Sequence, residues 1–324
     1  MDNFEKPIVV VSKCLGFDSC RFNGDIINDK FTEKLAPFVN YVTVCPEVEI
    51  GLGTPRKPIR IVSAGEGELR LVQPEEDRDI SDKMNDFSNV FLDSLGEVDG
   101  FILKNRSPSC GISDAKVMKG AERGPTIGKS AGFFGSAVNR KYSHLAIEDE
   151  GRLRNFQIRE HFLIKLFTLS RFRQIKKSSS FKALLDFHTK NKYLFMAYDQ
   201  VKLKQLGRII ANNKKGEPLQ VYESYEKVLY ELLEEPPGFT SKINVLHHIM
   251  GYFSKELTTE EKAFFLGLVE QYRENQVPLS SPAGVLRAWI VRFQNVYLRA
   301  QTFFYPYPDQ LIDITDSGKG RNYA

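Results

Sequence analysis

The sequence predicts an α/β domain with a mostly parallel sheet over residues 1–150 and an all-α domain over residues 151–324. Three observations predict this division. The chain has 324 residues, about twice the length of an average domain. Short apolar runs alternate with stretches of helical period before Arg152 and almost disappear after it. The formal charge also changes sign there, from −5 (19 Lys and Arg against 24 Asp and Glu) to +9 (26 against 17).

In the first domain, three short apolar runs predict buried strands, and a stretch between them predicts a helix. The runs are Ile8–Val11, Val39–Val44 and Phe101–Leu103, and apolar residues recur at helical spacing over Met84–Leu95. Strands that alternate with helices are typical of α/β domains, in which the strands run parallel.

In the second domain, successive amphipathic segments predict helices, and capping signals mark their boundaries. These signals are Ser178–Ser180 before Phe181, a capping box of Thr258 with Glu261, an N-cap at Ser281 with Pro282 in the first turn, and a helix stop at Pro236–Gly238.

The composition is that of an ordinary globular protein. Hydrophobic residues make up 42% and charged residues 27%, and four cysteines are too few for a disulfide scaffold. No apolar run approaches the roughly 20 residues that a membrane-spanning helix needs. Acidic residues precede a very short apolar stretch at the start, which is the wrong order for a secretory signal. We therefore expect a cytoplasmic protein without a membrane partner.

A basic block lies within the second domain. Residues 152–215 contain 16 basic and 3 acidic residues, whereas residues 216–324 contain 10 and 14. Such asymmetry predicts a polyanionic partner, either a nucleic acid or an anionic membrane surface. The alternative is a solvated helical face with no partner.

Three of the four cysteines follow predicted strands. Cys14 follows PIVVVSK, Cys45 follows FVNYVTV, and Cys110 follows GFILKNRSPS. Parallel strands would bring all three thiols to one sheet edge, where open α/β folds bind ligands. No C-x-x-C pair is present, so zinc-ribbon, bacterial ferredoxin and thioredoxin-like patterns are excluded. The alternative is that the cysteines are small buried hydrophobic residues.

The residues beside the cysteines favour a site over a packed core. Glu47 lies two residues after Cys45, and Ser107-Pro108-Ser109 precedes Cys110. A loop of Ser, Pro, Cys and Gly after a strand is typical of functional sites. The segment GLGTPR at 51–56 is only a weak phosphate-loop signal and does not predict a nucleotide site.

Four segments of the first domain resemble, in order and spacing, the motifs of the bacterial thiouracil desulfidase family. They are VVSKCLGF, CRFNGD, CPEVEIGLGTPRKPIRIV and ILKNRSPSCG. The second domain is similar to the helical domain often joined to it, through GRLRNFQIREHF, FHTKNKYLFMAY, INVLHHIMGYF and YLRAQTFFYPYPDQL. The two-domain form resembles the members of the family that act on 4-thiouridine in tRNA.

The resemblance implies a 4Fe-4S cluster at the carboxyl edge of the sheet, held by Cys14, Cys45 and Cys110, with Cys20 outside the ligand set. Three thiolates leave one of the four irons without a protein ligand. That iron would act as a Lewis acid on the soft thiocarbonyl sulfur. The implied reaction is a non-redox hydrolysis that yields uridine and hydrosulfide.

The resemblance also implies that Glu47 and Ser107 are catalytic residues. Small-molecule desulfidases of the family commonly carry an aspartate where this chain has Asn23. Because an amide cannot ionise, Glu47 is the better candidate for a general base.

The helical domain is expected to bind tRNA through the basic block, and no feature calls for an obligate protein partner. The candidate RNA-binding residues are Arg171, Arg173, Lys176, Lys190, Lys192, Lys202, Lys204 and Arg208. Two alternatives remain open: a desulfidase of free thiouracil-type bases, and a non-catalytic Fe-S protein that binds RNA.

Overall fold

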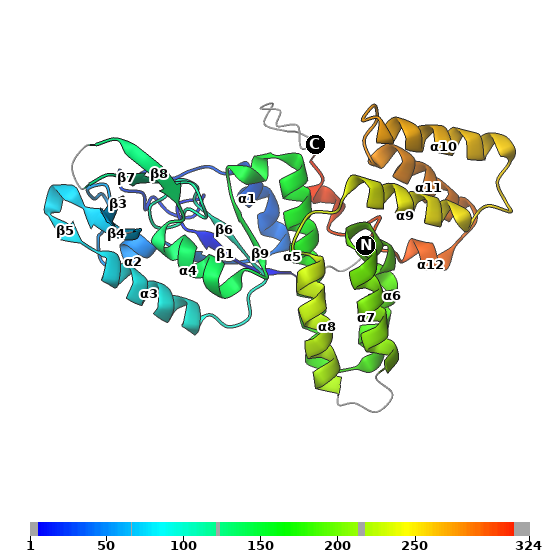
Figure 1. Cartoon of the computed structure of the whole chain (residues 1–324), viewed down its shortest axis with the longest axis horizontal. Helices are drawn as coiled ribbons and strands as arrows, with labels where there is room; N and C mark the ends of the chain where they lie inside the picture. The colour runs from blue at the N-terminus through cyan, green and yellow to red at the C-terminus, as the bar shows by residue number, and fades with distance from the viewer. Residues whose placement is uncertain (1–5, 66, 121–123, 213–217, 314–324) are drawn as a thin grey trace. The chain divides into compact units, whose positions relative to one another are not determined.

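The computed structural model describes residues 6–65, 67–120, 124–212 and 218–313 (Figure 1). Two compact units are distinguished. The first unit consists of the residues up to Ser170 and the segment from Gln310 onward, and the second unit spans Arg171–Asp309. The first unit contains the strands and the second consists of helices, so the predicted α/β and all-α parts are both confirmed.

A parallel sheet forms the centre of the first unit. Its strand order is β2-β1-β6-β9, and the bounds are β1 Ile8–Ser12, β2 Asn40–Val44, β6 Gly100–Leu103 and β9 Ala146–Asp149. The valines of β1 are completely buried, and each contributes about 1.5 kcal/mol or more through burial. Ser12 lies opposite Val44 in the register, so β1 and β2 end at the same edge. The three predicted strands are confirmed, and β9 is an addition.

A second sheet of the first unit was not predicted. Its order is β5-β4-β3-β7-β8, and only the β3–β7 pair is parallel. The strands are β3 Arg60–Gly65, β4 Glu68–Gln73, β5 Arg78–Asp79, β7 Ala115–Met118 and β8 Thr126–Ser130. Ile61, Leu71 and Val117 form its buried core together with Met84 of the helix that follows β5.

Short helices connect the strands of the first unit. They are α1 Lys30–Leu35, α2 Pro46–Glu49, α3 Ser81–Ser94 and α4 Phe133–Tyr142, with 3₁₀ turns η1 Ala36–Phe38, η2 Pro74–Glu76 and η3 Arg152–Arg154. The prediction of a helix over Met84–Leu95 is confirmed by α3. Asp29 caps α1 by accepting the N–H of Thr32 (2.8 Å), which satisfies one of the free donors at the start of that helix.

Glycine at the start of α4 permits a close approach to the loop that carries Cys110. A Cβ on Gly135 would collide with the carbonyl oxygen of Gly111 and lie 2.9 Å from that of Cys110. The N–H of Gly135 also donates to the carbonyl of Ser109 (2.9 Å). The first turn of α4 therefore supports the loop directly.

Gly135→Ala is expected to push α4 away from this loop. We expect the free energy of unfolding to fall by about 1–3 kcal/mol, because the added methyl overpacks a filled contact. Urea unfolding of the purified chain measures this loss. Gly96→Ala is the matched control, because nothing lies within 4 Å of its Cβ position. If Gly135→Ala were as stable as the control, the loop and helix α4 would have to accommodate the added methyl group by a small shift.

The second unit is built from helices that enclose an aromatic core. Helix α5 (Phe156–Ser178) leads into α6 Phe181–Tyr198, α7 Gln200–Asn212, α8 Pro218–Leu232, α9 Phe239–Gly251, α10 Thr259–Arg273, α11 Ser280–Arg292 and α12 Val296–Arg299, and the turn η4 Asp309–Leu311 follows. Trp289 is almost fully buried, with Phe253 packed edge-on and Phe265 tilted against its ring.

Most of the predicted helix boundaries are confirmed. Ser180 caps α6, the capping box of Thr258 with Glu261 begins α10, and α9 starts after Gly238. The predicted N-cap at Ser281 is wrong. The N-cap of helix α11 is Leu279, two residues earlier, and it makes no side-chain capping bond. Ser281 already lies inside the first turn.

No strand follows β9 in the parts of the chain that the structure describes. Among the same residues, no helix is both long and apolar enough to span a bilayer.

Candidate functional site

The three cysteines predicted to lie at one sheet edge line a single pocket of the first unit. Cys14 follows β1, Cys45 follows β2, and Cys110 lies in the loop after β6, so all three sit beyond the carboxyl ends of adjacent parallel strands. The three thiols line a pocket of about 370 Å³ together with Cys20, Glu47, Ser107 and others. A pocket of this size accommodates a small ligand.

The thiols of this pocket are free and mostly buried. Cys45 and Cys110 are buried, Cys14 is half-buried, and none forms a disulfide. Burial raises the pKa of Cys110 to about 12. A hydrogen bond to Cys20 and burial raise the pKa of Cys45 well above its ordinary range. Cys45 and Cys110 therefore stay protonated at neutral pH when no cation is bound to them.

Cys20 lies among the other thiols rather than apart from them. It is 3% exposed, and a hydrogen bond to the Cys14 thiol raises the pKa of Cys20 to about 11. Its carbonyl oxygen accepts a weak hydrogen bond from the Cys45 thiol (3.7 Å). The sequence placed Cys20 outside the ligand set, and its position shows that it packs directly against that set.

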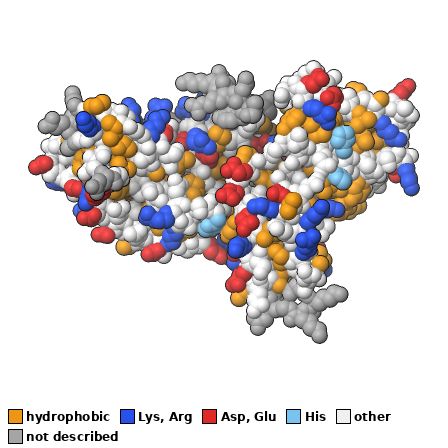
Figure 2. Space-filling model, in the orientation of Figure 1, with side chains coloured by type: hydrophobic (Ala, Val, Ile, Leu, Met, Phe, Trp, Pro, Cys, Tyr) orange, Lys and Arg blue, Asp and Glu red, His pale blue; other side chains and the backbone are white. Residues whose placement is uncertain are grey.

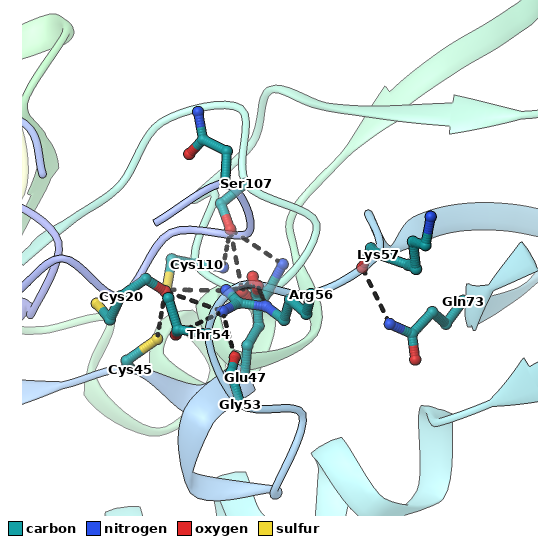
Figure 3. A network of polar contacts seen from close by, with 12 residues as sticks. Cys20, Cys45, Glu47, Gly53, Thr54, Arg56, Lys57, Gln73, Ser107 and Cys110 are labelled. Atoms are coloured by element: carbon teal, nitrogen blue, oxygen red, sulfur yellow. Dashed lines mark hydrogen bonds and ion pairs between the residues drawn. The ribbon is translucent and has the colours of Figure 1, made fainter. Parts of the chain in front are cut away.

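Glu47 is held by Arg56 and by Ser109, and the contact with Arg56 is drawn in Figure 3. The guanidinium of Arg56 donates through Nε to Oε2 of Glu47 (2.8 Å) and also pairs with it through a second nitrogen. The hydroxyl of Ser109 donates to Oε1 (2.6 Å). The side chains of Glu47 and Arg56 are 13% and 3% exposed, so this pair is sheltered from water.

Arg56 also donates hydrogen bonds to backbone carbonyl groups of two neighbouring segments. Its guanidinium donates to the carbonyl oxygens of Cys20 and Gly53 (both 2.9 Å), as Figure 3 shows. One side chain therefore fixes the loop after β1, the turn after α2 and the Glu47 carboxylate at once. Charge-assisted bonds of this kind are stronger than neutral ones, which makes Arg56 a rigid support for Glu47.

Ser107 organises the loop between β6 and Cys110. Its hydroxyl oxygen accepts the N–H groups of Ser109 (3.2 Å) and Cys110 (3.0 Å). It also lies 3.0 Å from the hydroxyl of Ser109. Because Ser109 directs its proton to Glu47, Ser107 is the donor in that contact. A hydrogen-bonded chain thus runs from Ser107 through Ser109 to Glu47.

Sequence reasoning gave Arg56 and Ser109 no role of their own. Ser109 counted only as part of the loop before Cys110, and Arg56 only as part of the GLGTPR segment, a weak phosphate-loop signal within a family motif. The sequence signal for its role is a cation nine residues after Glu47 in the same post-strand segment. Asn23, where the desulfidases commonly have an aspartate, is exposed and hydrogen-bonds Asp25.

The donor set of the pocket suits an iron–sulfur cluster better than a single hard ion. Among the described residues, no group of three or more His, Cys, Asp or Glu side chains is arranged to hold one metal ion. The donors gathered here are four free thiols, and thiolates are the usual ligands of Fe-S clusters, in which different cysteines bind different irons. The residues present therefore fit the group that the sequence implied.

The predicted RNA-binding residues lie on helices α5, α6 and α7 and differ in their surroundings. Lys190, Lys204 and Arg208 are exposed. The others engage the protein itself: Arg171 donates to the Pro306 carbonyl, Lys176 pairs with Glu226 (2.7 Å), Lys202 pairs with Glu231 (3.5 Å), Lys192 lies over the Tyr193 ring, and Arg173 is half-buried.

Acidic side chains accompany the basic ones at the surface. On the face drawn in Figure 2, Lys and Arg are interspersed with Asp and Glu rather than gathered into a field of one sign. Of the eight candidate RNA-binding residues, the exposed Lys190, Lys204 and Arg208 are the best suited to reach a ligand.

Two family matches divide the chain much as the sequence does. Residues 9–150 match the family described as 2-thiouracil desulfurase. Residues 192–308 match a family described as a protein of unknown function (DUF1722).

Individual relatives are similar to parts of the chain. The uncharacterized protein YbgA of Escherichia coli (strain K12) is 28% identical over 158 residues, which are 48% of this chain and 93% of the relative. The uncharacterized protein YbbK of Bacillus subtilis (strain 168) is 32% identical over 111 residues, which are 32% of this chain and 73% of the relative. No solved structure matches.

Proposed function

The chain belongs to a thiouracil-desulfurase-like family through its first unit, and we propose on that premise that it removes sulfur from 4-thiouridine in tRNA. The observation that carries the proposal is the pocket itself. It brings four free thiols, the Glu47 carboxylate and a hydrogen-bonded pair of serines to one edge of a parallel sheet. This combination suits a reaction in which a soft sulfur is bound and water attacks the carbon beside it.

Cys14, Cys45 and Cys110 would hold a 4Fe-4S cluster in this pocket. The bound cluster would supply an iron without a protein ligand, which is a Lewis acid for the thiocarbonyl sulfur. The cluster would also provide the positive partner that the buried thiols lack, and the cysteines would bind as thiolates.

Glu47 would take the proton of the attacking water. Each oxygen of a carboxylate has two acceptor positions. Oε2 is occupied by Arg56, whereas Oε1 accepts from Ser109 and keeps a position for water. Arg56 would keep the carboxylate fixed while the water is oriented, which lowers the entropic cost of the attack.

The serine chain would return that proton. Once Glu47 is protonated, both hydroxyls would turn so that Glu47 donates to Ser109 and Ser109 to Ser107. A proton can then pass from Glu47 through Ser109 to Ser107, whose hydroxyl faces the same pocket. Ser107 would then donate to the pyrimidine or to the departing sulfur. In sum, the oxygen of water bonds to the ring carbon, the C–S bond breaks, and hydrosulfide leaves without a net change in oxidation state.

The helical unit would bind the tRNA through phosphate contacts. Lys190 lies on α6, and Lys204 and Arg208 lie on α7, which packs against α6. Each cation that neutralises a phosphate releases a counterion, so affinity falls as salt rises.

Changing Lys190, Lys204 and Arg208 together to Gln is expected to flatten the salt dependence of tRNA binding. The log–log slope should become shallower by about 2–3, and KM for tRNA should rise. Fluorescence anisotropy across a salt series measures the slope. A control variant with Lys227, Lys255 and Arg299 changed to Gln removes the same charge outside the basic block. Equal slopes for both variants would mean that Lys190, Lys204 and Arg208 contact solvent and not tRNA.

The function is tested by comparing substrates under anaerobic conditions. The full chain, reconstituted with iron and sulfide, is incubated with bulk tRNA or with free 4-thiouracil, and nucleoside analysis follows the loss of 4-thiouridine. We expect turnover of tRNA. Turnover of the free base alone would favour a small-molecule desulfidase, and tRNA binding without sulfide release would favour a non-catalytic Fe-S protein.

A further inference from the structure

A second, larger hollow of the first unit adjoins the cysteine pocket. It measures about 730 Å³ and lies among the segments that follow β6 and β9, with β8 at its side. The two hollows share Lys104, Asn105 and Arg106 in their linings. A substrate with its base among the cysteines can therefore extend into the second hollow.

Five cations line this hollow, and two of them are neutralised within the protein. Lys104 forms an ion pair with the buried Glu150, and Arg152 pairs with Glu148 (2.7 Å). The remaining three are Arg106, Lys129 and Arg154. They are exposed, and within the described ranges no carboxylate partner is found for their side chains.

The carboxylates that line the hollow accept hydrogen bonds from backbone N–H groups. Glu150 also accepts the N–H of Asn105 (2.8 Å). Asp114 accepts the N–H of Arg106 (2.7 Å), and Asp149 accepts the N–H of Arg152 (2.8 Å). These backbone bonds leave the carboxylates charged, but five cations face three carboxylates in the lining, so the hollow keeps a net positive charge. Arg106, Lys129 and Arg154 are the cations that carry it toward a ligand.

Arg106 marks the junction between the two hollows and is held in an unusual conformation. Its φ is +56°, in the left-handed region that a non-glycine residue rarely adopts. The bond from its N–H to Asp114 supports that conformation. A strained residue kept in place at the boundary of a pocket is typical of a functional position.

We propose that Arg106, Lys129 and Arg154 bind a phosphate group of the substrate nucleotide while its base lies in the cysteine pocket. The inference rests on the proposed function and adds a phosphate site in the α/β unit to the contacts of the helical unit. Arginine and lysine are the side chains that proteins use for phosphate, and three of them around one hollow exceed what a free base needs. The site accounts for selection of a nucleotide over a free base.

The test compares two triple variants of the full chain. One changes Arg106, Lys129 and Arg154 to Gln, and the other, as a matched control, changes the exposed Lys30, Lys116 and Arg140 of the same unit to Gln. Turnover is measured on 4-thiouracil, 4-thiouridine, its 5′-monophosphate and thiolated tRNA. We expect KM in the first variant to rise about tenfold or more beyond any change on the base and nucleoside for the phosphate-bearing substrates, and the control to leave all four substrates unaffected.

The substrates distinguish the source of the phosphate. A rise for the monophosphate and tRNA indicates a site for either phosphate, and a rise for tRNA alone indicates a backbone phosphodiester. Unchanged KM for both would overturn the proposal, and so would an equal loss on all four substrates.

A binding measurement keeps the phosphate site separate from catalysis. Titration calorimetry with uridine 5′-monophosphate and with a short oligouridylate needs neither sulfur nor a cluster. At least one of the two should bind the first variant about tenfold more weakly than the control. Equal affinity of both probes for the two variants would overturn the phosphate site, whereas weakened binding without any turnover in the unmodified chain would overturn the desulfidase function alone.

Discussion

Replacing Cys14, Cys45 or Cys110 by alanine is expected to abolish both the iron–sulfur chromophore and desulfidase activity. An Fe-S cluster needs thiolate ligands, and the three thiols lie beyond the ends of β1, β2 and β6 in one pocket. Removing one ligand should leave a cluster that does not assemble or does not persist. Visible absorption and iron content after anaerobic reconstitution, followed by a turnover assay, measure both losses.

Cys20→Ala is the matched control for these variants. Cys20 is as buried as Cys45 and Cys110 and hydrogen-bonds Cys14 and Cys45, so its replacement perturbs the same pocket. We expect this variant to keep most of its cluster and activity. A full cluster in Cys110→Ala together with its loss in Cys20→Ala would reassign the third ligand to Cys20.

Glu47→Gln is expected to keep the cluster and lose turnover by about 10²-fold or more. Glutamine preserves the shape of the side chain but cannot accept a proton at neutral pH. The Arg56 and Ser109 contacts converge on this carboxylate, so no other carboxyl group is held in the same place. Iron content and single-turnover rates separate assembly from chemistry.

Glu49→Gln provides the comparison for this variant. Glu49 lies on the same short helix, α2, and is exposed. It should behave like the unmodified chain. If Glu47→Gln lost its cluster in proportion to its activity, Glu47 would be a structural support for the pocket and not a base.

Three strands of the first sheet were predictable from local apolar runs, whereas β9 was not. The runs at β1 and β6 are short, apolar and buried, and burial on both faces favours such runs. Most of β2 is exposed or half-buried, and its apolar run alone predicted it. The second sheet lacked that signal. In β4 and β5 the charged residues Glu68, Arg70 and Arg78 occupy exposed or half-buried positions, and these strands are defined by pairing across the sheet. In β7, Val117 pairs with Ile61, a distant partner that a local pattern does not show.

The cysteines and Glu47 of the candidate site were predictable from the sequence, whereas the residues that hold Glu47 in place were not. Cysteines after strands and a glutamate beside one of them are local patterns, and parallel topology brings them together. The contacts of Glu47 with Arg56 and Ser109 depend on how three loops fold against one another. Ser109 lies 62 positions from Glu47 in the sequence, and only the folded chain shows that they meet.

The most direct test of the account is the reaction of the anaerobically reconstituted full chain with thiolated tRNA in water labelled with heavy oxygen, without an added electron donor. Hydrolysis predicts that each 4-thiouridine lost yields one uridine carrying the heavy oxygen and one hydrosulfide. A sulfur loss that requires an electron donor, or a loss without heavy oxygen in the uridine, would contradict the hydrolytic mechanism. A chain that carries a full cluster but leaves 4-thiouridine unchanged would contradict the proposed function itself.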